Sequence, residues 1–213
     1  MLQIVETFTS IQGESTQAGR PCFFIRLAGC NLRCVYCDTM YANNTEGKSC
    51  SPEELLDLAR QSGVKLVEIT GGEPLMQSQT ADLCDLLLDN GFEVMMETNG
   101  SLPIDRISPR VRRILDCKLP DSGMSSRNDF GNYQHLTPMD EVKFVVSSRQ
   151  DFDYAVNVCR EYHLNEKTPN LLVSPVWGKV DFAVLADWVR DCGMDLRMQV
   201  QLHKVIWGNK PGV

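Results

Sequence analysis

The sequence lacks any run of basic residues, and no apolar stretch approaches the ~18 residues that a membrane-spanning helix needs. The formal net charge is -7, so the broad basic surface of a nucleic-acid-binding protein is not expected. The first residues, Met1 to Glu6, lack the basic start and long apolar core of a signal peptide. We therefore expect a cytoplasmic protein that binds neither membranes nor nucleic acids.

Histidine is scarce as well, with 3 residues, whereas cysteine is frequent, with 9. An odd number of cysteines in a chain without an export signal favours reduced thiols and metal chemistry over a disulfide framework. Cys84, Cys159 and Cys192 lie among apolar neighbours in helix-like segments, so we expect them in the core. With 43% hydrophobic and 23% charged residues, the composition indicates one globular domain spanning residues 1–213.

Three of the cysteines, Cys30, Cys34 and Cys37, form a Cys-x3-Cys-x2-Cys run. A structural zinc site needs four protein ligands, whereas three thiolates suit a 4Fe-4S cluster with one iron left open. The spacing therefore favours a cluster, with these three residues as its ligands and as catalytic residues. A zinc loop completed by Cys22 or Cys50, and three unrelated buried thiols, remain as alternatives.

Strand-like apolar runs alternate with amphipathic helix-like segments along the chain. Strands are expected at 22–28, 64–70, 92–97, 113–117, 142–146 and 171–173. Helices are expected from Ser51, a good N-cap, to Gly63, and at 78–90, 150–162 and 182–191, with a loop at 121–138. Strands separated by helices indicate a parallel sheet. Because a full eight-unit barrel needs ~250 residues, we predict an α/β fold with a partial βα barrel.

The cysteine loop follows one predicted strand, Gly71-Gly72-Glu73-Pro74 follows the next, and Glu97-Thr98-Asn99-Gly100 follows the third. Since parallel strands carry their sites at their carboxyl ends, all three segments should lie on one face. This arrangement resembles the radical S-adenosylmethionine superfamily. The resemblance implies a 4Fe-4S cluster whose open iron chelates the amino and carboxylate groups of S-adenosylmethionine. It also places Tyr36 against the adenine, with a ring packed only on the loop as the alternative.

A narrower resemblance rests on segments around that core: Thr9 to Glu14, Phe24 to Cys30, Cys37-Asp38-Thr39, Gln201 to Lys204 and Trp207 to Lys210. Together they look like the 7-carboxy-7-deazaguanine synthase family, over nearly the whole chain except a poorly marked stretch from Ser101 to Pro138. This family converts 6-carboxy-5,6,7,8-tetrahydropterin to 7-carboxy-7-deazaguanine with loss of ammonia, toward queuosine. The resemblance implies that a reduced cluster cleaves S-adenosylmethionine and that the resulting 5'-deoxyadenosyl radical abstracts hydrogen from the pterin.

The resemblance also assigns cofactor contacts. Thr39 matches the position where the family binds Mg2+ through a hydroxyl, and a hard oxygen ligand suits that ion. Asp116 departs from the Ser-Pro-Lys pattern of some members. The residues expected to contact the cluster or S-adenosylmethionine are Tyr36, Cys37, Asp38, Gly72, Glu73, Asp116, Cys117, Lys118, Ser174, Pro175, Val176 and Trp177. Glu73 could also accept hydrogen bonds from an ammonium group.

Substrate contacts are expected at Ile11, Gln12, Gly13, Glu14, Arg26, Thr70, His203 and Val213. Arg26 can clamp the substrate carboxylate with two parallel hydrogen bonds; a lateral ion pair at the strand end is the alternative. His203 follows the family motif, whereas His135 and His163 are expected at the surface. The tail from Trp207 should form a fixed turn over the site, with Trp207 as a buried anchor, the alternative being a disordered terminus.

Two other functions fit part of the pattern: a glycyl-radical-enzyme activase and a non-catalytic zinc-stabilised binding module. The Gln12 to Glu14 segment, Arg26 and the C-terminal motif favour a small carboxylated ligand over a protein substrate. We further expect a reductase, or a flavodoxin or ferredoxin, as electron donor, and a homodimer.

Overall fold

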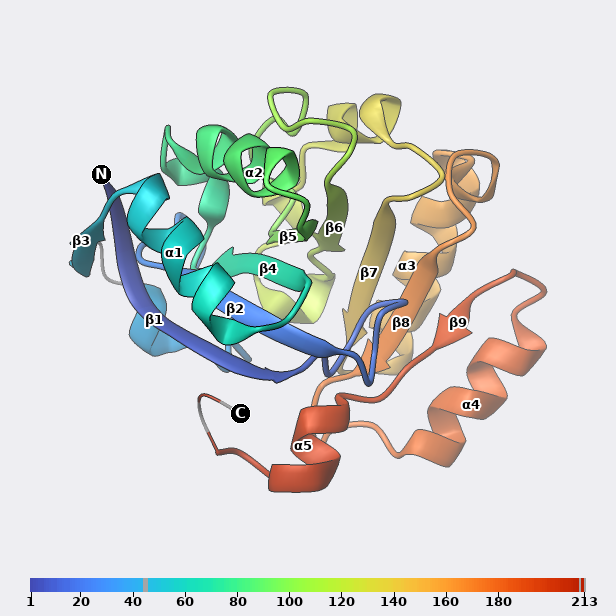
Figure 1. The fold of residues 1–213 in the computed structure, drawn as a ribbon. Helices are drawn as coiled ribbons and strands as arrows, with labels where there is room; N and C mark the ends of the chain where they lie inside the picture. Colours follow the sequence, from blue (N-terminus) through green and yellow to red (C-terminus); the bar gives the residue numbers. More distant parts are fainter. Residues whose placement is uncertain (44–45, 211, 213) are drawn as a thin grey trace.

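The computed structural model describes residues 1–43, 46–210 and 212. One curved nine-stranded sheet has the order β3-β1-β2-β4-β5-β6-β7-β8-β9, with helices packed on its outer face (Figure 1). The strands are β1 (Leu2–Ile11), β2 (Pro21–Leu27), β3 (Lys48–Cys50), β4 (Leu66–Gly71), β5 (Glu93–Thr98), β6 (Arg112–Cys117), β7 (Glu141–Val146), β8 (Leu171–Pro175) and β9 (Arg197–Met198). The α-helices are α1 (Pro52–Ser62), α2 (Thr80–Asp89), α3 (Arg149–Glu161), α4 (Phe182–Asp191) and α5 (Leu202–Trp207).

The partial barrel is confirmed, and the six predicted strands correspond to β2 and to β4 through β8. These strands and β9 pair in parallel. The sheet is nevertheless mixed, because β1 runs antiparallel to both β2 and β3. Within the described residues β3 and β9 are the two edges of the sheet, so the barrel stays open.

Four elements were not predicted: β1, β3, β9 and α5. Most residues of β1 are only half-buried, which weakens the alternation that marks a strand, and the other three elements are short. The interpretation of 121–138 as a plain loop was incomplete, because it contains short 3-10 helices at Ser125–Arg127 and Phe130–His135. Such turns carry too few residues for a recognisable period.

Local sequence explains the ends of α1. Ser51 Oγ accepts a hydrogen bond from the Glu54 N–H at 3.2 Å, and the Ser51 N–H donates to Glu54 Oε2 at 2.7 Å, which forms a capping box. Gly63 ends the helix with φ 73°, a conformation that glycine adopts without strain. No helix among residues 1–43 and 46–210 is long and apolar enough to cross a membrane.

The two faces of the strands carry different side chains, because successive residues point to opposite sides of a sheet. On β2, Ile25 and Leu27 pack in the main core on the helix side, whereas Phe24 and Arg26 face the inside of the curve. Near the strand starts, the inside is filled by a small apolar cluster of Cys22, Phe24, Leu66, Met95 and Ile114. Nearer the strand ends the inner residues are polar and charged, and there a cavity opens.

Candidate active site

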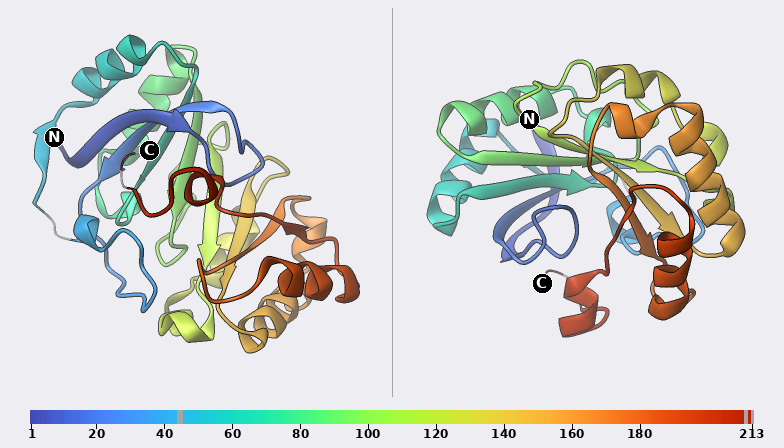
Figure 2. Two further views of the ribbon diagram at one scale, coloured as in Figure 1. Left: turned by 90° about the horizontal axis from the view of Figure 1, so that it is seen from below. Right: turned by 90° about the vertical axis from the view of Figure 1, so that its right-hand side faces the viewer.

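A cavity of about 490 Å³ lies at the C-terminal ends of the strands, a size typical of small-molecule sites. Its wall combines the turn after β1, the cysteine loop after β2, the inner faces of β4 to β7 and the C-terminal segment. Helix α5 lies across the open side of the sheet (Figure 2), so residues from both ends of the chain meet at one site. Among the predicted site residues, those that line the cavity are Ile11, Gln12, Gly13, Glu14, Arg26, Cys30, Cys34, Tyr36, Cys37, Asp38, Thr39, Thr70, Gly72, Asp116, Lys118, Val176, Trp177 and His203.

The three cysteines of the loop all line this cavity and are half-buried. The Leu32 N–H lies 3.4 Å from Cys30 Sγ, and the Asn99 amide nitrogen lies 3.8 Å from the same sulfur, so two donors face this ligand. Burial raises the pKa values of the Cys34 and Cys37 thiols. Bound iron would hold both as thiolates. The loop therefore fits an iron-sulfur cluster with three protein ligands.

The cysteines proposed to complete a zinc loop lie elsewhere. Cys22 is fully buried at the start of β2, the opposite end of the strand from the cysteine loop, and Cys50 is buried in the main core. Across the described part of the chain, no three His, Cys, Asp or Glu side chains are placed to hold a single metal ion. The structure thus gives the zinc alternative no fourth ligand.

Gly72 brings the segment after β4 into direct contact with the cysteine loop. A Cβ at this position would lie 2.1 Å from the Gly29 carbonyl oxygen and 2.9 Å from Cys30 Cβ. The Glu73 N–H donates to the same Gly29 oxygen at 2.7 Å. Only glycine fits here, because any side chain would displace the backbone that carries Cys30.

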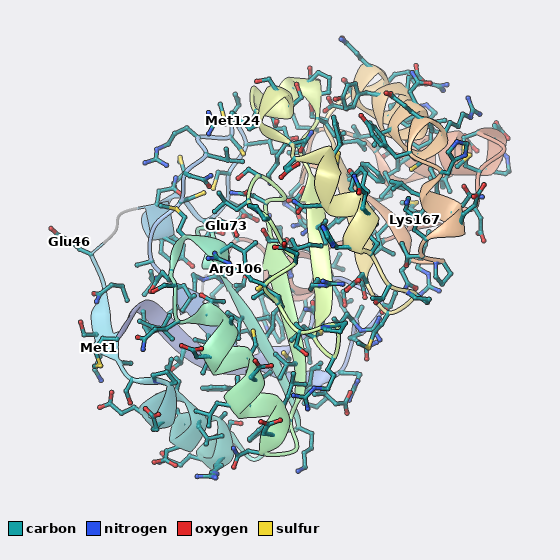
Figure 3. All side chains as sticks on the ribbon, turned by 90° about the horizontal axis from the view of Figure 1, so that it is seen from above. Met1, Glu46, Glu73, Arg106, Met124 and Lys167 are labelled. Carbon is teal, nitrogen blue, oxygen red and sulfur yellow. The ribbon has the colours of Figure 1, made fainter. Side chains whose placement is uncertain are left out.

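The Glu73 carboxylate is completely buried and does not line the cavity among the described residues. It accepts hydrogen bonds from the Leu75 N–H (2.9 Å), the Thr98 hydroxyl (2.8 Å) and the Asn99 N–H (2.6 Å). Figure 3 labels Glu73 in the view of the molecule from above. Its side chain therefore joins the ends of β4 and β5, and its contact with an ammonium group of the cofactor stays a prediction.

Cys117, Ser174 and Pro175 were also predicted to contact the cofactor, but none belongs to the described lining of the cavity. Cys117 faces the helix side, in the main core, whereas its neighbours Asp116 and Lys118 face inward. The alternation of side chains along β6 accounts for this difference. Lys118 Nζ lies 2.7 Å from Asp116 Oδ2, so the two inward residues form an ion pair.

Tyr36 lines the cavity, and its hydroxyl donates to the Val145 carbonyl at 3.1 Å, which fixes the ring between the loop and β7. Next to it, Asp38 Oδ1 accepts from the Thr39 hydroxyl at 3.0 Å, and Asp38 Oδ2 pairs with Lys204 Nζ at 2.6 Å. Burial alone would raise the pKa of Asp38, but the ammonium of Lys204 prevails and lowers it to about 2. Helix α5 is thereby tied to the cysteine loop.

Arg26 forms the lateral ion pair given as the alternative, and it also faces the cavity where a substrate carboxylate is predicted. Its Nε pairs laterally with Glu6 Oε1 at 2.8 Å, yet the residue lines the cavity, and the guanidinium lies 5.9 Å from the rings of Phe8 and Tyr41. Within the described residues only Nε of this guanidinium is hydrogen-bonded, which leaves its two terminal nitrogens for a carboxylate.

The turn after β1 packs against α5. The Leu202 N–H donates to the Gly13 carbonyl at 2.8 Å, and a Cβ on Gly13 would lie 2.1 Å from His203 Nδ1. Gln201 Nε2 donates to Glu14 Oε1 at 2.8 Å. Burial lowers the pKa of His203, which favours the neutral imidazole. These contacts bring the two distant motifs into one wall.

The C-terminal tail differs from the prediction at Trp207. Trp207 is not a buried anchor, because it ends α5 and is 39% exposed. Val213 lies outside the described residues. His135 and His163 are exposed, as expected, and Cys84 and Cys159 are core residues.

Sequence reasoning missed two charged residues inside the sheet, Glu68 and Lys143, and gave no role to Glu97, which it had placed on this face. Lys143 Nζ pairs with Glu14 Oε2 at 3.1 Å and with Glu97 Oε1, while Glu68 accepts a hydrogen bond from Gln12 Nε2. A charge within an apolar strand was the available signal. It drew attention to Arg26 but applies equally to Glu68, which stands in Leu-Val-Glu-Ile-Thr.

Comparison with known proteins agrees with this geometry. Residues 24–118 match the radical SAM superfamily. The chain is 40% identical to the 7-carboxy-7-deazaguanine synthase of Clostridium acetobutylicum, with 99% of each chain covered. It is 41% identical to that of Chlorobaculum tepidum, with 97% of this chain and 94% of the relative covered.

A solved structure supports the fold independently. The crystal structure of QueE from Escherichia coli superposes with a TM-score of 0.73 at 24% identity, over 95% of this chain and 94% of that chain. The chain therefore belongs to the 7-carboxy-7-deazaguanine synthase family of radical S-adenosylmethionine enzymes, which employ a 4Fe-4S cluster and S-adenosylmethionine.

Proposed function

We propose that this protein converts 6-carboxy-5,6,7,8-tetrahydropterin to 7-carboxy-7-deazaguanine and ammonia. The observation that carries the proposal is one cavity in which the three thiols of the cysteine loop face a wall of polar groups from β1, β2 and α5. The bound cluster and S-adenosylmethionine supply the radical chemistry. Cys30, Cys34 and Cys37 hold the cluster, and Gly72 keeps the neighbouring backbone close to it.

The protein's own residues bind and orient the pterin. The terminal nitrogens of Arg26 receive the substrate carboxylate, and Glu14 accepts hydrogen bonds from ring N–H groups. Thr70 and His203 complete the wall. Such a site discriminates strongly against ligands that leave its buried polar groups unpaired.

The Thr39 hydroxyl would hold Mg2+, a hard ion that accepts such an oxygen ligand and retains part of its hydration shell. Asp116, Lys118, Val176 and Trp177, which line the same cavity, would contact S-adenosylmethionine. We further propose a single domain for residues 1–213, a homodimer, and a flavodoxin, a ferredoxin or their reductase as electron donor.

The test is anaerobic incubation of reconstituted protein with reductant, S-adenosylmethionine and the tetrahydropterin, with products identified by mass. Deazaguanine and ammonia should form in equal amounts, and Mg2+ should increase the rate. Cys34→Ala, which removes one cluster ligand, is the matched control. Formation of 5'-deoxyadenosine without any deazaguanine would refute the substrate assignment. It would favour the alternative function, that of a glycyl-radical-enzyme activase.

A further inference from the structure

The inner face of the sheet contributes several carboxylates to the cavity, close to the residues proposed to bind the pterin. Glu14, Glu68 and Glu97 all line it, together with Lys143. Lys143 pairs with Glu14 Oε2 at 3.1 Å and with Glu97 Oε1. In the part of the chain that the structure describes, Glu68 has no ion-pair partner, although only 3% of its surface is exposed.

The hydrogen bonds of the Gln12 side chain show which end of its amide faces Glu68. The Glu14 N–H donates to Gln12 Oε1 at 2.6 Å. A backbone N–H can only donate, so the amide oxygen must face Glu14 and the amide NH2 group must face Glu68. One oxygen of Glu68 thus accepts from a neutral group. The other has no hydrogen-bond partner among residues 1–43 and 46–210, and the residue lines the cavity.

A buried carboxylate without a cation is costly, and a proton removes the charge. The charged and titratable groups around Glu68 come from every packed element: Glu97 from β5, Lys143 from β7, Glu14 from the turn after β1, and Arg26 and Cys22 from β2. Burial and the negative charge of Glu97 raise the pKa of Glu68 well above its usual range, and the opposing effect of Lys143 does not offset them. Burial raises the pKa of Glu97 as well, but Glu97 and Glu14 pair directly with Lys143 and Glu68 does not, so the proton belongs on Glu68.

We propose that Glu68 is a specificity-determining residue that binds the pterin as a neutral carboxylic acid: one oxygen accepts from Gln12, and its O–H donates to a lone pair of the ring. This inference rests on the proposed function. It assigns different tasks to neighbouring carboxyl groups, because ionised Glu14 and Glu97 can only accept hydrogen bonds whereas protonated Glu68 also donates. A bicyclic ring with both N–H donors and lone-pair acceptors matches this combination.

The variants Glu68→Gln and Glu68→Leu test whether Glu68 acts as a neutral hydrogen-bond donor or as an ionised carboxylate. Glutamine keeps an acceptor for Gln12 and a donor for the ligand, so binding of oxidised 6-carboxypterin should stay within about threefold of wild type. Leucine keeps the approximate volume but removes both bonds, so affinity should fall about tenfold or more, as for a lost buried hydrogen bond. Binding of this stable ligand is followed by fluorescence and needs no turnover.

Two further measurements are independent of the leucine variant's folding. An infrared difference spectrum of wild type minus Glu68→Gln should contain the C=O band of a protonated carboxyl group at neutral pH. Affinity of the wild type for 6-carboxypterin should fall in alkaline solution as Glu68 ionises, whereas Glu68→Gln should not show this loss. Glu93→Gln is the matched control, since Glu93 pairs with Arg20 at the surface, with 58% of its side chain exposed; it should titrate like wild type.

The proposal is overturned if the spectrum contains a carboxylate band in place of the protonated one, or if Glu68→Gln loses as much affinity as Glu68→Leu. Failure of the proposed function has a different signature, since the wild type would then make no deazaguanine and would not bind 6-carboxypterin. The infrared band would still report the protonation state of Glu68.

Discussion

Replacing Gly72 by alanine should separate assembly of the cluster from folding of the protein. An added Cβ would lie 2.1 Å from the Gly29 oxygen, whereas ordinary contacts begin at 3.4 Å, so the two backbones must separate by about 1.3 Å. The atoms to be displaced are the backbone of Gly29 and the Cβ of Cys30. Neither is the flexible end of a side chain, so the strain reaches the first cluster ligand.

The expected cost follows from two contributions. Overpacking of this kind costs about 1–3 kcal/mol. The shift also lengthens the 2.7 Å hydrogen bond from the Glu73 N–H to the Gly29 oxygen, and a buried donor left without a partner costs about 1–3 kcal/mol. A folded domain is stable by about 5–15 kcal/mol, so the variant should still fold if its total loss lies at the lower end of these ranges. Cys30, however, no longer faces Cys34 and Cys37 correctly, and iron binding should fall well below wild type.

The assay compares unfolding in urea, followed by circular dichroism, with iron content after anaerobic reconstitution. Gly91→Ala is the control, because Gly91 has φ 79° and nothing described lies within 4 Å of an added Cβ. Alanine in this left-handed conformation costs roughly 1–2 kcal/mol. The control should therefore lose stability and keep its iron. If Gly72→Ala assembles a full cluster and cleaves S-adenosylmethionine at the wild-type rate, the contact with Cys30 does not control the site.

Three more predictions follow from named contacts. Lys204→Met removes the cation that pairs with Asp38, so KM for the pterin should rise severalfold at unchanged iron content; unchanged KM and kcat would disprove the coupling between α5 and the cysteine loop. Thr39→Ala should weaken the dependence of turnover on Mg2+ without affecting iron content, and a Mg2+ titration identical to wild type would contradict the assignment. Glu68→Gln should be more stable than wild type at neutral pH, because native Glu68 retains a proton that the unfolded chain releases above its ordinary pKa. This advantage should vanish as the pH falls below about 4.5, and a difference in urea stability that is constant with pH would disprove it.

The parallel part of the fold could be predicted from the sequence because its signals are local. Ser51 and Glu54 cap α1, Gly63 ends it, and most residues of β4 to β8 are buried. The spacing of the cysteine loop favoured a cluster, and the segments that follow the next two strands were needed to choose it over a zinc loop. The structure leaves the residue roles as predictions, but it shows that all three thiols reach one cavity.

Two differences between the expected and the observed lining of the cavity, at Cys117 and Glu68, have one physical origin, which is the alternation of side chains along a strand. Motif resemblance selected Asp116, Cys117 and Lys118 as a continuous segment, but alternation turns the middle residue into the helix-side core. The same alternation turns Glu68 inward. Alternate residues of a strand face opposite sides of the sheet. Counting from the residues on the apolar, helix-facing side would therefore have placed Cys117 in the core and Glu68 in the cavity. Glu73 is different, since it follows its strand, and only the tertiary contacts show that its carboxylate is occupied.

The sequence placed the C-terminal segment over the site but did not predict helix α5, because the order of this helix comes from contacts with distant parts of the chain. A helix as short as α5, Leu202–Trp207, is not stable by itself. It is held by the Leu202 bond to Gly13, the Gln201 bond to Glu14 and the Lys204 pair with Asp38. These three partners belong to the substrate and metal sides of the proposed site. We therefore expect ordering of α5 and occupation of the cavity to be linked, because a ligand that fixes the turn after β1 and the cysteine loop would also fix the helix across the open barrel.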